Sequence, residues 1–169
     1  MIIIVMGLPG SGKSYFAAQL ASMIKATYIN SDKERKKLLS IRTYTENEKS
    51  FVYDAMLEKM KGLIKKNKKV VLDATFYKDE IRQKFINEAD GKVPFFLIEV
   101  KASEAIVRER LKKTRPDSEA DFEVYKKIKK QWEPLETDHL ILRSTNDNIK
   151  NMLQKALDYL PLKNDKNAN

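Results

Sequence analysis

The sequence predicts a three-layer α/β/α fold, in which a parallel sheet of about five strands lies between two layers of helices. Short apolar runs without polar alternation are the first indication, because strands that are apolar on both faces suit a sheet covered by helices. The intervening segments are long enough for helical crossovers between parallel strands. The runs that we predict as strands are 2–6, 70–74, 95–100 and 139–143, with the shorter 27–30 as a fifth.

The helices between these runs follow from apolar spacing and from residues that start or stop a helix. Residues 14–25 come after a glycine-rich loop and carry apolar side chains at helical spacing. Thr45 and Glu48 form a predicted capping box before an apolar stripe that ends at Ile64. Further helices are predicted at 79–89, 103–113, 121–132 and 146–159, and the last two are stopped by Pro134 and Pro161.

The composition fits one domain of a cytoplasmic protein. The chain has 169 residues, for which we predict one unit over 1–160 and a disordered, polar tail over 161–169. The absence of cysteine excludes disulfides and thiolate nucleophiles and favours an intracellular setting. The first apolar run is too short for a signal peptide or a membrane span, so no membrane partner is expected. The net charge of +9 favours polyanionic partners, although the lysines are scattered as on many solvated helices.

The strongest motif is GLPGSGKS at 7–14, which matches G-x-x-x-x-G-K-[ST] between a predicted strand and a predicted helix. The glycines let successive N–H groups point at phosphate oxygens, and the helix N-terminus attracts the same negative charge. Lys13 is predicted to bridge the β- and γ-phosphates and Ser14 to bind Mg²⁺, so the predicted cofactors are ATP and Mg²⁺. The alternative is a glycine turn that contains Lys-Ser by chance. The predicted nucleotide-binding residues here are Gly7, Pro9, Gly10, Ser11, Gly12, Lys13, Ser14 and Tyr15.

A second substrate is indicated by YINSDKER, where Asp32 and Arg35 follow the short strand at the edge that faces ligands in an open sheet. Asp32 would accept a hydroxyl proton as the oxygen attacks the γ-phosphate, and Arg35 would orient an anionic acceptor. The alternative is a helix N-cap with a solvated arginine in the first turn. The chain lacks the Asn-Lys-x-Asp of GTPases and is too short for the usual hexameric ATPase module, which leaves a stand-alone kinase.

The glycine loop followed by Asp-x-x-Arg resembles the kinase domain of bacteriophage-type polynucleotide 5′-kinases. This resemblance implies that Asp32 is the general base and that Arg35 contacts an acceptor phosphate. The run VVLDATF adds Asp73 and Thr75, whose Asp-x-Thr pattern is similar to the same family. Asp73 fits a Walker B strand, where it would hold the Mg²⁺ shell or organise Arg35. We therefore predict Arg35, Asp73 and Thr75 on the acceptor side, with Ser14 and Asp73 near the metal.

The segment VRERLKKTRPDSEADF is the predicted lid. Arg110 is predicted to stack on adenine and Arg115 to stabilise charge on the transferred phosphoryl group, whereas Arg108 is predicted to face solvent. The run DSEADFEVYKKIKKQWEP followed by HLILRST resembles the lid and terminal strand of a broader group of AAA_33-type ATP-binding kinases, with zeta-toxin-like and gluconate-kinase-like branches. That resemblance covers most of 1–145, and in some branches the acceptor is a small metabolite or a nucleotide sugar.

Together these features predict an ATP-dependent phosphotransferase with Lys13, Asp32 and Arg115 as catalytic residues. The leading acceptor is the 5′-hydroxyl of DNA or RNA. Two alternatives stay open: a P-loop kinase for a sugar, nucleoside or nucleotide sugar, and an ATP-binding regulatory module with slow hydrolysis. The pairing of Asp32 with Arg35 argues against the regulatory module. The sequence makes no prediction of the oligomeric state.

Overall fold

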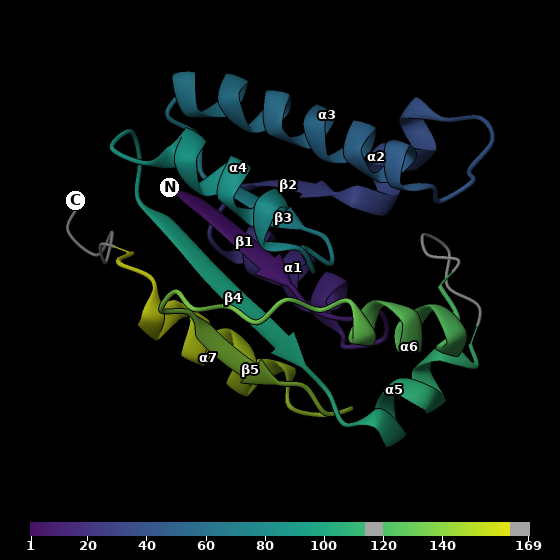
Figure 1. The fold of residues 1–169 in the computed structure, drawn as a ribbon. Helices are drawn as coiled ribbons and strands as arrows, with labels where there is room; N and C mark the ends of the chain where they lie inside the picture. Colours follow the sequence, from purple (N-terminus) through teal and green to yellow (C-terminus); the bar gives the residue numbers. More distant parts are fainter. Residues whose placement is uncertain (114–119, 163–169) are drawn as a thin grey trace.

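The apolar runs form a parallel sheet between two layers of helices (Figure 1). The computed structural model describes residues 1–113 and 120–162, and within them the sheet has five strands in the order β2-β3-β1-β4-β5. All four pairings are parallel, so the predicted fold class is confirmed. The strands are β1 (Ile2–Met6), β2 (Thr27–Asn30), β3 (Val70–Asp73), β4 (Phe95–Lys101) and β5 (Leu140–Arg143).

The register of the sheet brings the carboxyl ends of three strands together. Asp73 at the end of β3 lies beside Val5 of β1 on one side and beside Asn30 of β2 on the other. The glycine loop follows β1 and residues 31–38 follow β2, so the predicted donor and acceptor residues leave the sheet at the same edge. This is the edge at which open parallel sheets bind ligands.

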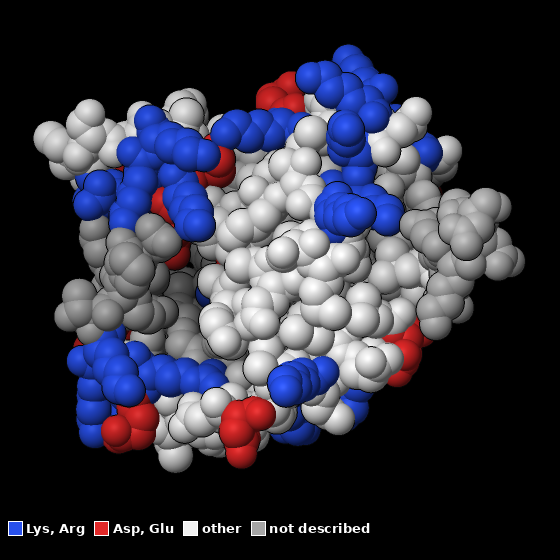
Figure 2. All heavy atoms as spheres, turned by 180° about the vertical axis from the view of Figure 1, so that it is seen from behind, with Lys and Arg blue, Asp and Glu red and all other residues white. Residues whose placement is uncertain are grey.

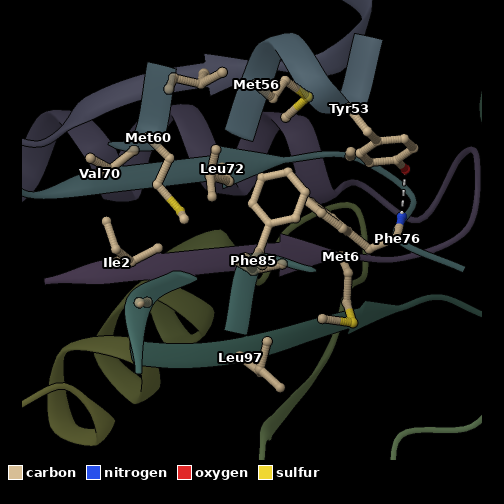
Figure 3. Close-up of a cluster of buried hydrophobic side chains, with 14 of the residues drawn as sticks. Ile2, Met6, Tyr53, Met56, Met60, Val70, Leu72, Phe76, Phe85 and Leu97 are labelled. Atoms are coloured by element: carbon tan, nitrogen blue, oxygen red, sulfur yellow. Dashed lines mark hydrogen bonds between the residues drawn. The ribbon is translucent and has the colours of Figure 1, made fainter. Parts of the chain in front are cut away.

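Seven helices occur in the described part of the chain, and four of them cover the two faces of the sheet. The alternating side chains of β1 divide the core, since Ile2, Ile4 and Met6 pack toward α3 and α4, and Ile3 and Val5 pack toward α1 and α7. Figure 3 shows the first of these clusters. The helices are α1 (Lys13–Met23), α2 (Ser31–Leu38), α3 (Glu46–Lys65), α4 (Asp79–Ala89), α5 (Glu104–Leu111), α6 (Phe122–Lys130) and α7 (Ile149–Tyr159).

An aromatic cluster in the core fixes the loop that follows β3. The ring of Phe76 lies 5.1 Å from that of Tyr53 and 5.2 Å from that of Phe85, measured between centroids. The Tyr53 hydroxyl accepts a hydrogen bond from the Phe76 amide at 3.0 Å (Figure 3). Phe76 has a φ of 48°, which a side chain adopts only where its surroundings hold it. The core therefore positions the neighbouring residues Thr75 and Tyr77.

The helix α2 is the main difference from the predicted elements. Its sequence SDKERKKL has no apolar stripe, which is why periodicity does not indicate a helix there. Asn30 is its N-cap and accepts a hydrogen bond from the Lys33 amide at 2.9 Å, so Asp32 lies within the first turn and is not the cap. Glu34 of α2 forms an ion pair with Lys59 of α3, which ties the two helices together.

The end of the chain and the surface add two further findings. Leu162, in the predicted disordered tail, packs against the core on the α7 side, and residues 163–169 lie outside the described part. No helix of residues 1–113 and 120–162 has both the length and the apolar character needed to cross a membrane.

Candidate active site

The loop between β1 and α1 is built so that only glycine fits at two of its positions. Gly12 has a φ of 92°, and a Cβ atom there would lie 2.8 Å from the Ser144 hydroxyl. At Gly7 a Cβ would lie 2.4 Å from the Val100 carbonyl oxygen. The helix α1 begins directly after Gly12 and has no side-chain cap, so its first N–H groups face outward. Such a helix N-terminus is suited to bind phosphate.

Arg110 of α5 holds this loop against the loop that follows β5. Its Nη1 atom donates to the carbonyl oxygens of Gly10 at 3.3 Å and Ser11 at 3.1 Å, and its Nη2 atom donates to that of Thr145 at 2.7 Å. Burial lowers the pKa of the guanidinium from its ordinary value. The predicted nucleotide contact of Arg110 stays a prediction, and the structure adds a bracing role that the sequence does not indicate.

A cavity of about 480 Å³ adjoins the N-terminus of α1. Its wall includes the predicted residues Gly10, Gly12, Lys13, Ser14, Tyr15 and Arg110. The opposite part of the wall was not predicted and comes from the β5–α7 loop, including Thr145, Asn146 and Asn148. The signal that would have found these residues is the polar run STNDN, because it follows a strand at the ligand-facing edge. We refer to this space as the donor cavity.

A second cavity, of about 220 Å³, brings together five of the predicted site residues. Lys13, Asp32, Arg35 and Thr75 all line it, together with Pro9, which was predicted to contact the nucleotide. Lys13 lines both this cavity and the donor cavity, so the two spaces meet at this residue. We refer to the second space as the acceptor cavity.

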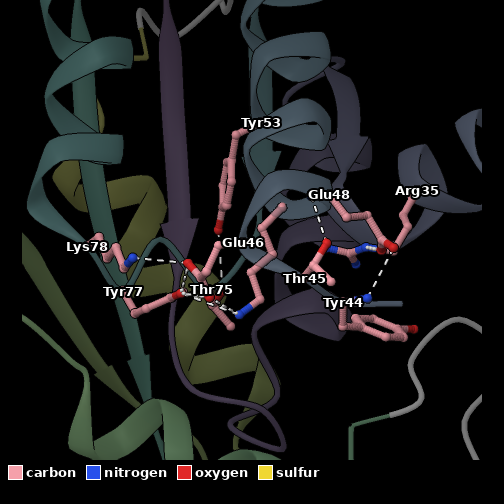
Figure 4. A network of polar contacts seen from close by, with 10 residues as sticks. Arg35, Tyr44, Thr45, Glu46, Glu48, Tyr53, Thr75, Tyr77 and Lys78 are labelled. Carbon is pink, nitrogen blue, oxygen red and sulfur yellow. Dashed lines mark hydrogen bonds and ion pairs between the residues drawn. The ribbon is translucent and has the colours of Figure 1, made fainter. Parts of the chain in front are cut away.

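Arg35 lies between two carboxylates at the wall of the acceptor cavity. Its Nη1 atom is 2.8 Å from Asp32 Oδ1. Its Nε atom is 3.0 Å from Glu48 Oε1 (Figure 4). The side chains of Arg35 and Glu48 are 8% and 7% exposed, respectively, so this pair is largely removed from water. The predicted contact of Arg35 with an acceptor stays a prediction, but two carboxylates of the protein already match its charge.

The predicted capping box of α3 is only half formed, because the Glu48 carboxylate binds other groups. Thr45 does cap α3, since its hydroxyl accepts from the Glu48 amide at 3.3 Å. The Glu48 carboxylate instead accepts from the Thr43 amide at 2.6 Å, the Thr43 hydroxyl at 2.9 Å and the Tyr44 amide at 3.0 Å. Burial acts to raise the pKa of Glu48, but these hydrogen bonds and the charge of Arg35 outweigh it and lower the pKa below its ordinary value. Glu48 therefore fixes both Arg35 and the loop that carries Tyr44.

Asp73 is fully buried at the end of β3 and does not line the acceptor cavity. Its Oδ2 atom accepts from the Tyr28 hydroxyl and from Asn30 Nδ2, each at 2.6 Å, whereas Oδ1 is buried without a hydrogen-bond partner among the described residues. The Tyr28 hydroxyl also lies 3.4 Å from the Ser14 carbonyl oxygen. An unpartnered carboxylate oxygen beside the helix N-terminus fits the predicted role of Asp73 toward Mg²⁺ better than a direct acceptor contact.

The residues after β3 form the floor of the acceptor cavity. The Thr75 hydroxyl lies 3.3 Å from that of Tyr53, whose pKa is raised to about 12 by burial, so Tyr53 stays protonated at neutral pH. The Tyr77 hydroxyl donates to Glu46, which also accepts from Lys49 at 2.8 Å (Figure 4). The sequence did not predict Tyr53, Tyr77 or Lys49 as cavity residues, because they resemble ordinary core and surface positions.

Arg82 connects this floor to the segment that follows α6. Its Nη1 atom donates to the Phe76 carbonyl oxygen at 2.9 Å, and its Nη2 atom donates to that of Pro134 at 3.2 Å. The Glu133 amide also donates to the Tyr77 carbonyl oxygen at 2.9 Å. The loop after β3 is therefore held from both the core side and the α6 side.

The predicted lid is described only in part. Arg115 lies outside the described residues, so its catalytic role stays a prediction. Arg108 is exposed as predicted, forms an ion pair with Glu104, and places its guanidinium 3.9 Å from the centre of the Phe122 ring. The helix α6 supplies part of the acceptor cavity wall through Val124, Lys127 and Ile128.

Comparison with known proteins assigns the chain to a family. A family model described as an AAA domain, AAA_33, matches residues 2–135, which is most of the chain. The chain belongs to the AAA_33 family. A search of the curated proteins found no match.

Solved structures place this AAA_33 chain among proteins with the P-loop kinase fold. A gluconokinase from Sinorhizobium meliloti 1021 superposes with a TM-score of 0.69 at 20% identity, covering 92% of this chain and 89% of the other. The APS kinase CysC from Mycobacterium tuberculosis, in complex with AMPPNP and APS, gives 0.70 at 17% identity, with coverages of 93% and 95%. Kti12 from Chaetomium thermophilum, in complex with ADP-AlF3, gives 0.67 at 20% identity, with coverages of 94% and 98%.

Proposed function

We propose that this AAA_33 protein is an ATP-dependent kinase that phosphorylates a hydroxyl group of a small molecule. The observation that carries the proposal is the meeting of two cavities at Lys13. One cavity adjoins the N-terminus of α1, which is suited to bind phosphate, and the other is lined by Asp32. A donor and an acceptor bound in these two spaces would approach each other at a cation, which is the arrangement that phosphoryl transfer needs.

On the donor side, the N–H groups of the glycine loop and of α1 would bind the phosphates of ATP. Lys13 would neutralise charge that develops on the transferred group. Ser14 and Asp73 are the residues that would hold Mg²⁺, because the first is at the start of α1 and the second has a buried, unpartnered oxygen. Bound Mg²⁺ would supply further charge neutralisation at the β- and γ-phosphates.

On the acceptor side, Asp32 would act as the general base. The acceptor oxygen forms a bond to the γ-phosphorus as the bond from that phosphorus to the departing ADP oxygen breaks. The hydroxyl proton passes to the Asp32 carboxylate, whose orientation is set by its ion pair with Arg35. This alignment of Asp32 supports a kinase over a regulatory module with slow hydrolysis.

The size and walls of the acceptor cavity support a small acceptor over a polynucleotide. Its volume of about 220 Å³ is below the roughly 300–1,000 Å³ of sites for drug-sized ligands. On the face seen in Figure 2, the lysine and arginine side chains of the described residues form separate groups around a centre without charged side chains, whereas a basic stripe is the usual footprint of nucleic-acid binding. The names of the gluconokinase, of a sugar kinase from Janibacter sp. HTCC2649 and of the APS kinase also indicate small acceptors for those proteins.

The test is phosphoryl transfer from labelled ATP to a panel of sugars, sugar acids, nucleosides and 5′-hydroxyl oligonucleotides. We expect product with a small molecule, a loss of at least ~100-fold in turnover for Lys13→Ala, and a loss of about 10² to 10⁴-fold for Asp32→Asn with ATP affinity retained. Asp54→Asn, at an exposed position of α3, is the matched control and should retain full activity. Efficient transfer to oligonucleotides alone would contradict the small acceptor, and unchanged transfer in Asp32→Asn would contradict the assigned base.

A further inference from the structure

We propose that the acceptor carries an acidic group, a carboxylate or a phosphate, and that Lys127 of α6 binds this group. The inference rests on the proposed kinase function and names the chemical class of its acceptor. Among the described residues, four basic side chains line the acceptor cavity, namely Lys13, Arg35, Lys49 and Lys127, against a single carboxylate, that of Asp32.

Two of the four cations, Arg35 and Lys49, are paired with carboxylates of the protein, and Lys13 is assigned to the phosphates of ATP. Arg35 is held between Asp32 and Glu48. Lys49 forms an ion pair with Glu46 at 2.8 Å, and the hydrogen bonds from Lys49 and Lys78 lower the pKa of Glu46 to about 2. Lys13 lines the donor cavity as well and would be matched by the phosphates of ATP.

Lys127 differs from these three cations and from Lys126 and Lys129 of α6. Lys126 pairs with Glu123 at 2.6 Å, and Lys129 pairs with Glu104 at 3.2 Å. Lys127 has no ion pair or hydrogen bond among the described residues, although its side chain lines a cavity. An ammonium group without a carboxylate partner at the wall of a concave site attracts anions, because low-dielectric walls concentrate its field.

The charge balance of the cavity supports one acidic group on the acceptor. With ATP bound, Lys13 is matched, and the pairs made by Arg35 and Lys49 are internal to the protein. The charge of Lys127 is then the one that a bound acceptor would balance. The small volume of the cavity means that the acidic group and the reacting hydroxyl would belong to the same compact molecule.

The experiment measures binding before it measures turnover. The wild-type protein is saturated with AMPPNP and Mg²⁺, so that the donor cavity is filled, and is titrated in a calorimeter at fixed ionic strength. The probes are two sets that share a carbon skeleton: glucose, gluconate and glucose 6-phosphate, and glycerol, glycerate and glycerol 3-phosphate. Each neutral parent is thereby compared with a carboxylate and with a phosphate.

We expect at least one acid to bind about 10-fold or more tightly than its neutral parent, as for a hydrogen bond to a charged group. Lys127→Ala should abolish that advantage and Lys127→Glu should reverse it. Lys130→Ala is the matched control, since Lys130 lies on α6 outside the cavity wall, and it should retain the advantage. Comparison of the carboxylate with the phosphate of each set identifies which acid is preferred.

Three results would overturn the inference: absence of binding by all four acids, equal binding of acids and parents, or equal behaviour of Lys127→Ala and Lys130→Ala. For an acid that is phosphorylated, Lys127→Ala should raise KM about 10-fold while kcat changes little, because Lys127 binds a group remote from the reacting oxygen. If acids bind through Lys127 and none is phosphorylated, the anion site stands and the kinase assignment fails. The two proposals therefore fail on different measurements.

Discussion

Replacing Arg35 with alanine should lower the stability of the protein. It should also lower the rate of phosphoryl transfer, because Arg35 orients the proposed base Asp32. The side chain of Glu48 is 7% exposed and loses its contact with Arg35 Nε at 3.0 Å. Truncating one member of a buried charge pair costs about 2–5 kcal/mol, because the other charge is left unpaired. Glu48 keeps three hydrogen bonds from Thr43 and Tyr44, so we expect the lower part of that range, about 2–3 kcal/mol.

The assay is urea unfolding at pH 7, in which Arg35→Ala should lower the free energy of unfolding with an unchanged denaturant slope. The exposed pair of Lys92 and Glu88 provides the control, and Lys92→Ala should cost less than ~1 kcal/mol. Adding Glu48→Gln to Arg35→Ala removes the unpaired charge, so the double variant should lose less than the two single losses combined. Equal costs for Arg35→Ala and Lys92→Ala would refute the reasoning.

The pH dependence gives an independent check on the same residues. The pKa of Glu48 in the folded protein is below its ordinary value of 4.5, so its ionised form stabilises the fold at pH values above about 4.5. That stabilisation is lost as the pH falls through the lowered pKa. Without Arg35 the pKa is lowered less, and the difference in stability between wild type and Arg35→Ala should therefore shrink below pH 4.5. A difference that is constant from pH 7 to pH 3 would contradict this assignment.

Three further predictions follow from single positions. Gly12→Ala should abolish ATP binding in calorimetry, because position 12 has a φ of 92° and the added Cβ would lie 2.8 Å from the Ser144 hydroxyl. Gly62→Ala is the control: this position in α3 has open space around it, so the substitution should stabilise the protein by up to about 1 kcal/mol. The Glu46 carboxyl should titrate in NMR spectra at about pH 2, and Lys49→Ala should move its pKa toward 4.5; a titration near 4.5 in wild type would contradict the ion pairs. Asp73→Asn should raise the Mg²⁺ concentration required for half-maximal turnover, and an unchanged requirement would remove Asp73 from the metal site.

The parts of the site at strand ends could be predicted from the sequence because a parallel sheet has one simple geometry. Once β1, β2 and β3 are recognised, their carboxyl ends lie at one edge, and Lys13, Asp32 and Thr75 must be near each other there. The observed acceptor cavity contains all three. The glycine loop is equally predictable, since its function depends on local backbone geometry and on residues that are adjacent in the chain.

The parts supplied by helices could not be predicted in the same way. Tyr53, Lys49 and Lys127 reach the cavity because of how α3 and α6 pack. A helical pattern in the sequence indicates that one face of a helix is buried, but it does not indicate which element packs against that face. Glu48 illustrates the competition between local and distant contacts. The sequence offers it as a capping residue of α3, but its carboxylate is taken by Arg35 and by the loop before the helix. The helix α2 was missed because contacts with α3, and not an apolar stripe, hold it in place.

The division of the site into two cavities has a consequence for how this protein can diversify. The donor cavity is made by the glycine loop, α5 and the segment after β5, whereas the acceptor cavity takes its outer wall from Tyr44 and from α6. Substitutions in the loop before α3 or on α6 would thus alter which molecule enters without disturbing the binding of ATP. Lineages derived from such a chain can acquire new substrates by changing two short surface segments while the sheet and its phosphate chemistry are inherited intact.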